Sequence, residues 1–161
     1  MAVLVGCGSF VFHTVPTPLT LWLDILPILI FQIVFIWNFC RRVTKLNAWS
    51  TVLVLLLVIG SALILRPLRQ PMNGSLFYFP PMITLLVFAW IWAETSQREP
   101  WSLFVAALAF ALAVIARSID WEVDFKTGTH FCWHLMNGLV VYFILRTVVL
   151  WEARQPSGKI S

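Results

Sequence analysis

Apolar residues occur in long runs along the whole chain, and short stretches with charged residues or proline separate them. A helix rises about 1.5 Å per residue, so about 17–25 apolar residues are enough to cross a bilayer. The pattern therefore predicts an all-α, polytopic transmembrane helical bundle with six helices. The helices are expected at Ala2–Val15, Thr20–Phe39, Trp49–Leu65, Leu76–Ala93, Trp101–Ala116 and Gly128–Leu150.

The first of these runs is shorter than the others and ends at Pro16 and Pro18. Its roughly 14 residues cover about 21 Å as a helix, whereas the hydrocarbon core of a bilayer is about 30 Å thick. We therefore expect a further helix to be encoded upstream of Met1. At the other end, the polar residues of about 152–161 are expected to form a frayed tail.

Composition supports a membrane protein with a single transmembrane domain covering residues 1–161. The chain has 161 residues, of which 60% are hydrophobic and 11% charged, and its mean hydropathy is +0.88. The formal net charge is +4, but the basic residues lie mostly between apolar runs. In that position they orient the chain in a bilayer, and they do not form a patch for nucleic acid.

The distribution of lysine and arginine predicts the orientation. Seven of these residues lie on the side of the even-numbered loops and the C-terminal tail, and four lie on the opposite side. The positive-inside rule then places the C-terminus in the cytoplasm. The residues of the first group are Arg41, Arg42, Lys45, Arg98, Arg146, Arg154 and Lys159, and Arg146 is expected to snorkel out of the last helix.

The three cysteines, Cys7, Cys40 and Cys132, favour neither a disulfide framework nor a thiolate metal site. They are odd in number and form no CxxC pair. Cys132 lies between two histidines in the sequence, but two residues along a helix point to different faces. It is interpreted as a small buried hydrophobic residue.

The chain contains only three histidines, and two of them form the pair His130-x-x-x-His134. Residues four apart lie one turn apart on the same helix face, so both side chains can reach one ion. The third histidine, His13, follows Ser9 at the same spacing, and Asp24 lies early in the next apolar run. Ionisable groups inside a membrane are costly and are usually functional.

The predicted topology places these five polar residues at a similar depth, near the exoplasmic side. The shared depth favours one metal site over a separate structural role for each of the five residues. Each residue also has a simpler interpretation. A lone histidine can form a hydrogen bond between helices, Ser9 can bond to a carbonyl of its own helix, and Asp24 can stabilise a helix N-terminus.

The residue types suit hydrolysis by zinc. Three neutral imidazoles, from His13, His130 and His134, leave the fourth tetrahedral position of Zn²⁺ open for water. The ion lowers the pKa of that water toward ~7. Asp24 is then placed to act as a general base, and Ser9 to orient the water or stabilise an oxyanion. Nearby aromatic residues suit a lipid substrate.

An acidic run, Asp120-Trp-Glu122-Val-Asp124, precedes the histidine pair. Its oxygens are of the type that bind Ca²⁺, but it lacks the glycine and spacing of an EF-hand loop. It is interpreted as a solvated loop. Gln32, Asn38 and Asn137 are candidates for hydrogen bonds between helices.

Two segments give the chain a resemblance to a known family. GCGSFVFH, followed by an aspartate eleven residues after its histidine, and GTHFCWHLMNGLVVY resemble the alkaline ceramidases. That family belongs to a superfamily with the progestin and adipoQ receptors. The resemblance implies a fold of seven transmembrane helices, of which this chain contains the last six.

The resemblance also implies an activity and its residues. His13, His130 and His134 correspond to the zinc ligands, and Ser9 and Asp24 to the catalytic pair. The implied enzyme is a zinc-dependent amidohydrolase that cleaves ceramide, or a related lipid, to sphingosine and a fatty acid. Its partners are the lipid substrate and membrane lipids. Compact loops favour a bacterial member in the inner membrane, and the acidic N-terminal stretch that binds calcium in eukaryotic ceramidases is missing.

Two other classes of function fit part of the pattern. A zinc-containing receptor or lipid-sensing protein without significant turnover would keep the same ligands. A metal or proton transporter would use histidine and aspartate as a relay, but it predicts polar residues at several depths. Release of product from a lipid amide separates the enzyme from both.

Overall fold

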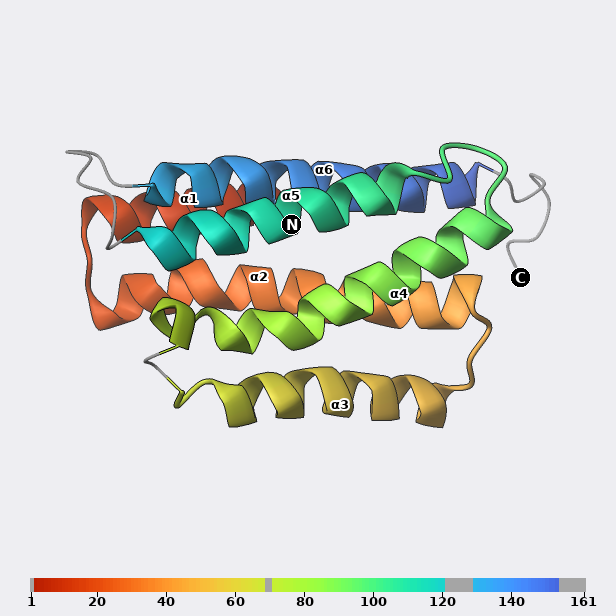
Figure 1. Ribbon diagram of the computed structural model, residues 1–161, viewed down its shortest axis with the longest axis horizontal. Coiled ribbons are helices and arrows are strands. Elements are labelled where there is room, and N and C mark those ends of the chain that lie inside the picture. Colours follow the sequence, from red (N-terminus) through yellow and green to blue (C-terminus); the bar gives the residue numbers. More distant parts are fainter. Residues whose placement is uncertain (1, 69–70, 121–128, 154–161) are drawn as a thin grey trace. The chain divides into compact units, whose positions relative to one another are not determined.

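The computed structural model describes residues 2–68, 71–120 and 129–153. These residues form helices, turns and loops and no strand, which confirms the all-α prediction. Within the described ranges the helices are α1 (Ala2–Thr14), α2 (Pro18–Asn38), α3 (Ala48–Leu65), α4 (Phe79–Thr95), α5 (Ser102–Ile119) and α6 (His130–Glu152), with a π-helical segment η1 (Phe39–Val43) and a short 3₁₀ segment η2 (Pro71–Tyr78) (Figure 1).

Within the described residues, five helical stretches are long and apolar enough to cross a membrane, so the chain is a multi-pass integral membrane protein. Their large apolar side chains are often exposed, as with Ile64 at 76% and Trp90 at 65%. Such surfaces are suited to lipid, not to water. α1 is apolar but has only 13 residues, as the short first run predicted. The five stretches are Pro18–Val43, Ala48–Leu65, Met72–Thr95, Ser102–Ile119 and Phe131–Glu152.

The chain divides into two compact units, Met1–Leu55 and Leu56–Ser161, with the boundary inside α3. In the first unit, α1 and α2 form a hairpin across a short connection (Figure 1). Thr17 caps α2 by a reciprocal bond. The Thr20 backbone N–H donates to Thr17 Oγ1 (3.2 Å), and the Thr17 N–H donates to Thr20 Oγ1 (2.8 Å). The cap fixes where α2 begins relative to the end of α1.

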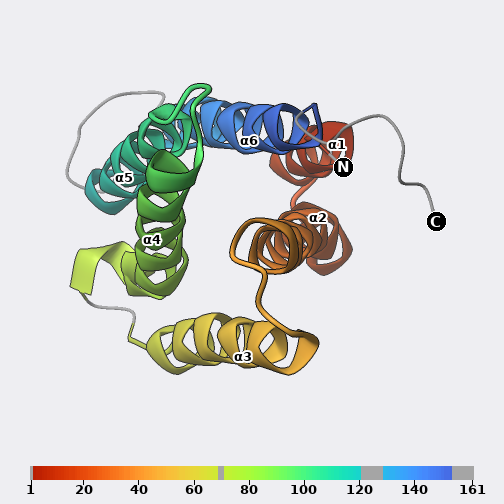
Figure 2. The ribbon, with the colours of Figure 1, turned by 90° about the vertical axis from the view of Figure 1, so that its right-hand side faces the viewer.

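In the second unit, α5 packs against α4, α6 and η2 (Figure 2). Its buried face contains small residues, including Ala106 and Ala113, whose side chains are completely buried. Small side chains let neighbouring helices approach closely, which matters in a membrane because lipid offers no hydrophobic drive between helices. α5 is therefore the central helix of this unit.

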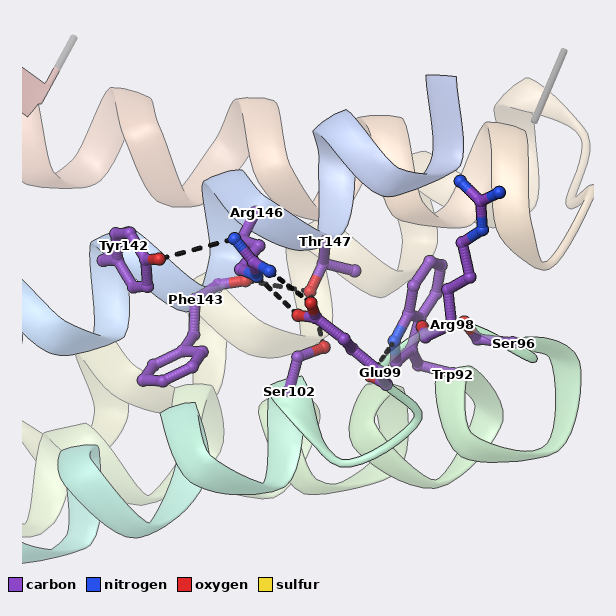
Figure 3. A network of polar contacts seen from close by, with 9 residues as sticks. All are labelled: Trp92, Ser96, Arg98, Glu99, Ser102, Tyr142, Phe143, Arg146 and Thr147. Atoms are coloured by element: carbon purple, nitrogen blue, oxygen red, sulfur yellow. Dashed lines mark hydrogen bonds and ion pairs between the residues drawn. The ribbon is translucent and has the colours of Figure 1, made fainter. Parts of the chain in front are cut away.

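A polar network joins the loop between α4 and α5 to α6 (Figure 3). Arg146 donates two hydrogen bonds to the Glu99 carboxylate, and Ser102 shares a hydrogen bond (3.1 Å) with Thr147. The hydrogen bond from Arg146 holds the pKa of the Glu99 carboxyl below its ordinary value. Glu99 has a left-handed backbone (φ 48°), and its carbonyl accepts a bond from Trp92 Nε1 (3.1 Å). These contacts hold the strained residue in place.

Candidate metal and catalytic site

Ser9 and His13 lie in the second half of α1, one turn apart on one face, as their spacing predicts. Ser9 is half-buried, and His13 is exposed and lies in the last turn of the helix. The ring of His13 lies edge-on to that of Phe12, with centroids 5.3 Å apart. α1 thus presents a hydroxyl and an imidazole along one side of the first helix.

Asp24 lies in α2, nearly two turns after its first residue, Pro18. Its Oδ1 atom is buried and has no hydrogen-bond partner among the described residues. A buried carboxylate oxygen without a partner is costly, so such atoms usually face a metal, a water or a substrate. If Asp24 only stabilised the N-terminus of α2, its carboxylate oxygens would not need to be buried without a partner. The buried Oδ1 therefore favours a chemical role for Asp24 over a purely structural one.

Gly8 brings α1 and α2 close together at the level of Ser9 and Asp24. A β-carbon on Gly8 would lie 2.0 Å from the Leu23 carbonyl oxygen and 3.4 Å from the Asp24 nitrogen. The Leu23 carbonyl has no regular helical donor, because the residue four positions later is Pro27, which lacks an N–H group. The proline thus leaves a carbonyl available for the close approach of Gly8. Ser9 and Asp24 each follow directly after a residue of this contact.

The histidine pair lies at the start of α6, which begins at His130 and contains His134 one turn later. His134 is half-buried. The start of α6 is fixed to the end of α5 through Thr129, whose backbone N–H donates to Asp120 Oδ1 and whose Oγ1 lies 2.7 Å from the Ala116 carbonyl oxygen and 2.9 Å from Asp120 Oδ1. These bonds position the start of α6, whose first two turns contain the pair, relative to α5.

Asp120 is the one residue of the acidic run that the structure describes. It accepts hydrogen bonds from Thr129, so its role is to connect α5 to α6. Glu122 and Asp124 lie outside the described residues, and the solvated-loop interpretation stays a prediction for them. The sequence does not indicate the bond between Asp120 and Thr129, because it joins residues nine positions apart.

The zinc site itself stays a prediction. His13 belongs to the first unit and the histidine pair to the second, and the side chain of His130 lies outside the described residues. Among the side chains that are described, no three from His, Cys, Asp and Glu gather as metal ligands. Cys132, expected to be buried, is half-buried, and Cys7 is exposed.

Arg117, one of the four basic residues on the side opposite the C-terminus in the predicted topology, lies beside an aromatic residue of α6. Arg117, in the last turn of α5, has its guanidinium 5.8 Å from the ring centre of Tyr78 and 5.6 Å from that of Trp133. Trp133 immediately precedes His134. A signal was present in the sequence, since Arg117 is a charged residue close to an apolar run, but its aromatic neighbours come from two other segments.

No family model, curated protein or solved structure matches this chain. The class that the fold defines is a multi-pass helical membrane protein. Anything more specific depends on the five polar residues, on the local geometry around them and on the motif resemblance.

Proposed function

We propose that the protein is an intramembrane zinc-dependent hydrolase that cleaves the amide bond of ceramide or a related lipid. The observation that carries the proposal is the buried Oδ1 of Asp24, which has no partner among the described residues and lies beside the close approach of α1 to α2 at Gly8. A carboxylate in that position fits the role of a general base that takes a proton from water. The chemistry of the other side chains agrees, because they supply three imidazoles and one hydroxyl.

The ligands of the proposed metal are His13, His130 and His134. When bound, zinc would lower the pKa of a water and polarise the amide carbonyl. Asp24 takes the proton of the attacking water and later delivers it to the leaving nitrogen, which is how one carboxylate serves as base and then as acid. Ser9 donates a hydrogen bond to the oxygen that becomes negatively charged. The products are a fatty acid and an amine such as sphingosine.

Metal content tests the ligand assignment. Purified protein is expected to contain about one zinc per chain, since three imidazoles complete a catalytic ligand set. His134→Ala is expected to lose most of the zinc, whereas Cys132→Ala keeps it. The cysteine variant is the matched control, because it removes a metal-binding side chain two residues away. Equal zinc content in the two variants would show that the assignment is wrong.

Turnover tests the reaction. Release of fatty acid from a short-chain fluorescent ceramide in detergent is expected for the wild type. Asp24→Asn keeps the shape of the side chain and the zinc but cannot accept a proton, so activity is expected to fall about 10²–10⁴-fold. Ser9→Ala is expected to cost no more than about 10²–10³-fold. Zinc without any turnover in the wild type would favour a receptor or lipid sensor.

The proposed location is a bacterial inner membrane, with the C-terminus in the cytoplasm. The compact loops support the bacterial membrane, and the seven-to-four distribution of lysine and arginine between the two sides supports the orientation. In this orientation the proposed site lies near the exoplasmic surface, so a substrate from the outer leaflet would reach it directly.

A further inference from the structure

A polar cluster separate from the five proposed site residues lies where η2, α5 and α6 meet in the second unit. We define the Arg117 cluster as Ser75, Tyr78, Arg117 and Trp133. The rings of Tyr78 and Trp133 contact each other, with centroids 4.6 Å apart, and the Arg117 guanidinium lies over both. The Asn73 side chain also donates to the Arg117 carbonyl (3.2 Å), so η2 is tied to this turn of α5.

Two atoms of the cluster are buried and lack hydrogen-bond partners among the residues that the structure describes. Arg117 Nε is one, and Ser75 Oγ is the other; Ser75 is completely buried. Ser75 lies in η2 between Asn73, which bonds to Arg117, and Tyr78, which contacts its guanidinium. A buried polar atom without a partner destabilises a fold. Two in one junction indicate that a further group is normally bound there.

The chemistry of the two atoms identifies the missing group. Arg117 Nε can only donate a hydrogen bond, and the Ser75 hydroxyl can donate as well. The Tyr78 and Trp133 rings lie beside the Arg117 guanidinium, and the N–H groups of a guanidinium can form hydrogen bonds in its own plane. Within the described part of the chain, Arg117 forms no ion pair with a carboxylate. A ligand with a negative charge and several acceptor oxygens satisfies all these donors.

We propose that the Arg117 cluster binds an oxyanion, a phosphate or a carboxylate, carried by a lipid headgroup or free in solution. Arginine at a membrane-protein helix end is a known type of headgroup ligand, because its planar fork matches the oxygens of a phosphate or carboxylate. The proposal goes beyond hydrolysis and does not depend on it, since it concerns binding alone. The backbone before Ser75 supports a specialised site, because Met72, Asn73 and Gly74 all have left-handed conformations.

Binding by the purified full chain in neutral detergent tests the proposal. Three probes separate the sources: dioctanoyl phosphatidic acid, dioctanoylglycerol with the same tails, and inorganic phosphate. Phosphatidic acid is expected to bind and to raise the unfolding temperature of the wild type. If inorganic phosphate binds with the same affinity as phosphatidic acid, the natural ligand is a free anion and not a lipid headgroup. Equal affinity for dioctanoylglycerol would overturn the proposal, because the tails alone would then explain binding.

Variants test the residues. Arg117→Gln is expected to raise the Kd for phosphatidic acid about tenfold or more, because it removes charge-assisted hydrogen bonds. Arg117→Lys keeps the positive charge but lacks the planar guanidinium. Its Kd for phosphatidic acid is expected to lie between those of the wild type and Arg117→Gln. Arg98→Gln is the matched control, since it removes the same charge from the loop before α5. An unchanged Kd in Arg117→Gln, or equal losses in Arg117→Gln and Arg98→Gln, would overturn the proposal.

Ser75→Ala separates binding from folding. It removes a buried hydroxyl that has no partner, so the ligand-free protein is expected to become more stable. The same change is expected to raise the Kd for phosphatidic acid several-fold, because the ligand loses one donor. A purely structural serine would not change stability and affinity in opposite directions. Lower stability together with unchanged affinity would contradict the role of Ser75.

Discussion

Alanine at Gly8 is expected to separate α1 from α2, because the added carbon meets main-chain atoms. The new β-carbon would lie 2.0 Å from the Leu23 oxygen and 2.8 Å from the Leu23 carbonyl carbon, whereas ordinary contacts begin at 3.4 Å. Neither atom belongs to a side chain, so no rotation relieves the overlap. α1 must move by roughly 1.4 Å, the difference between 3.4 and 2.0 Å.

The magnitude follows from two opposing effects. Overpacking of this kind costs about 1–3 kcal/mol, and replacing glycine by alanine inside a helix stabilises it by up to about 1 kcal/mol. Gly6→Ala supplies the control, since a β-carbon there has nothing within 4 Å. Because both variants share the gain in helix propensity, the difference in their free energy of unfolding measures the contact at Gly8, about 1–3 kcal/mol.

The assay is unfolding of both variants in the same detergent, followed by ceramide hydrolysis. Gly6→Ala is expected to be at least as stable as the wild type and Gly8→Ala less stable. A displacement of this size next to Ser9 is also expected to reduce hydrolysis by about 10²-fold, because reacting groups tolerate little misplacement. Equal stability of the two variants would refute the close approach of α1 to α2.

Three further predictions concern other parts of the chain. The pKa of Glu99 is lowered by Arg146, so the ion pair is expected to stabilise the fold above the ordinary carboxyl pKa. The advantage of the wild type over Glu99→Gln should then disappear as pH falls through the lowered value, and unfolding temperatures between pH 7 and pH 3 measure this. Met72 has a left-handed backbone, which costs a non-glycine residue about 1–2 kcal/mol, so Met72→Gly is expected to raise the unfolding temperature; a drop would contradict the strain. A reporter that is active only in the cytoplasm is expected to work when fused after Ser161, and activity only outside the cytoplasm would reverse the orientation.

The helices were predictable because each depends on a local run of apolar residues. The fourth run shows the limit of that approach. The span expected at Leu76–Ala93 lies within the apolar stretch Met72–Thr95, but the helix α4 begins only at Phe79 and the preceding residues form η2. Pro80 and Pro81 fit the first turn of a helix, where a missing N–H group costs nothing. Asn73 and Gly74 are typical turn residues that tolerate the left-handed conformation, but they precede the predicted span, and Met72 has no such preference.

Contacts between segments were less predictable. The one-turn spacing of Ser9 and His13, and of the α6 pair, follows from helix geometry alone. The pairing of Arg146 with Glu99 joins residues far apart in the sequence, and composition does not indicate it. Asn38 and Asn137, expected to bond between helices, instead donate to carbonyls of their own helices. A short amide side chain reaches the carbonyl four residues back more easily than a neighbouring helix.

The way α6 is fastened to its neighbours restricts how its length can change. Thr129 fixes its first turn to α5, and Arg146 fixes a later turn to the loop before α5. Inserting or deleting one residue between them would rotate one end relative to the other by about 100°. The helix face that contains the histidine pair and the side chain of Arg146 could not then both keep their orientations. Genetic variation that preserves the protein should therefore appear in α6 as substitutions, and gains or losses of residues should be confined to the tail after Glu152.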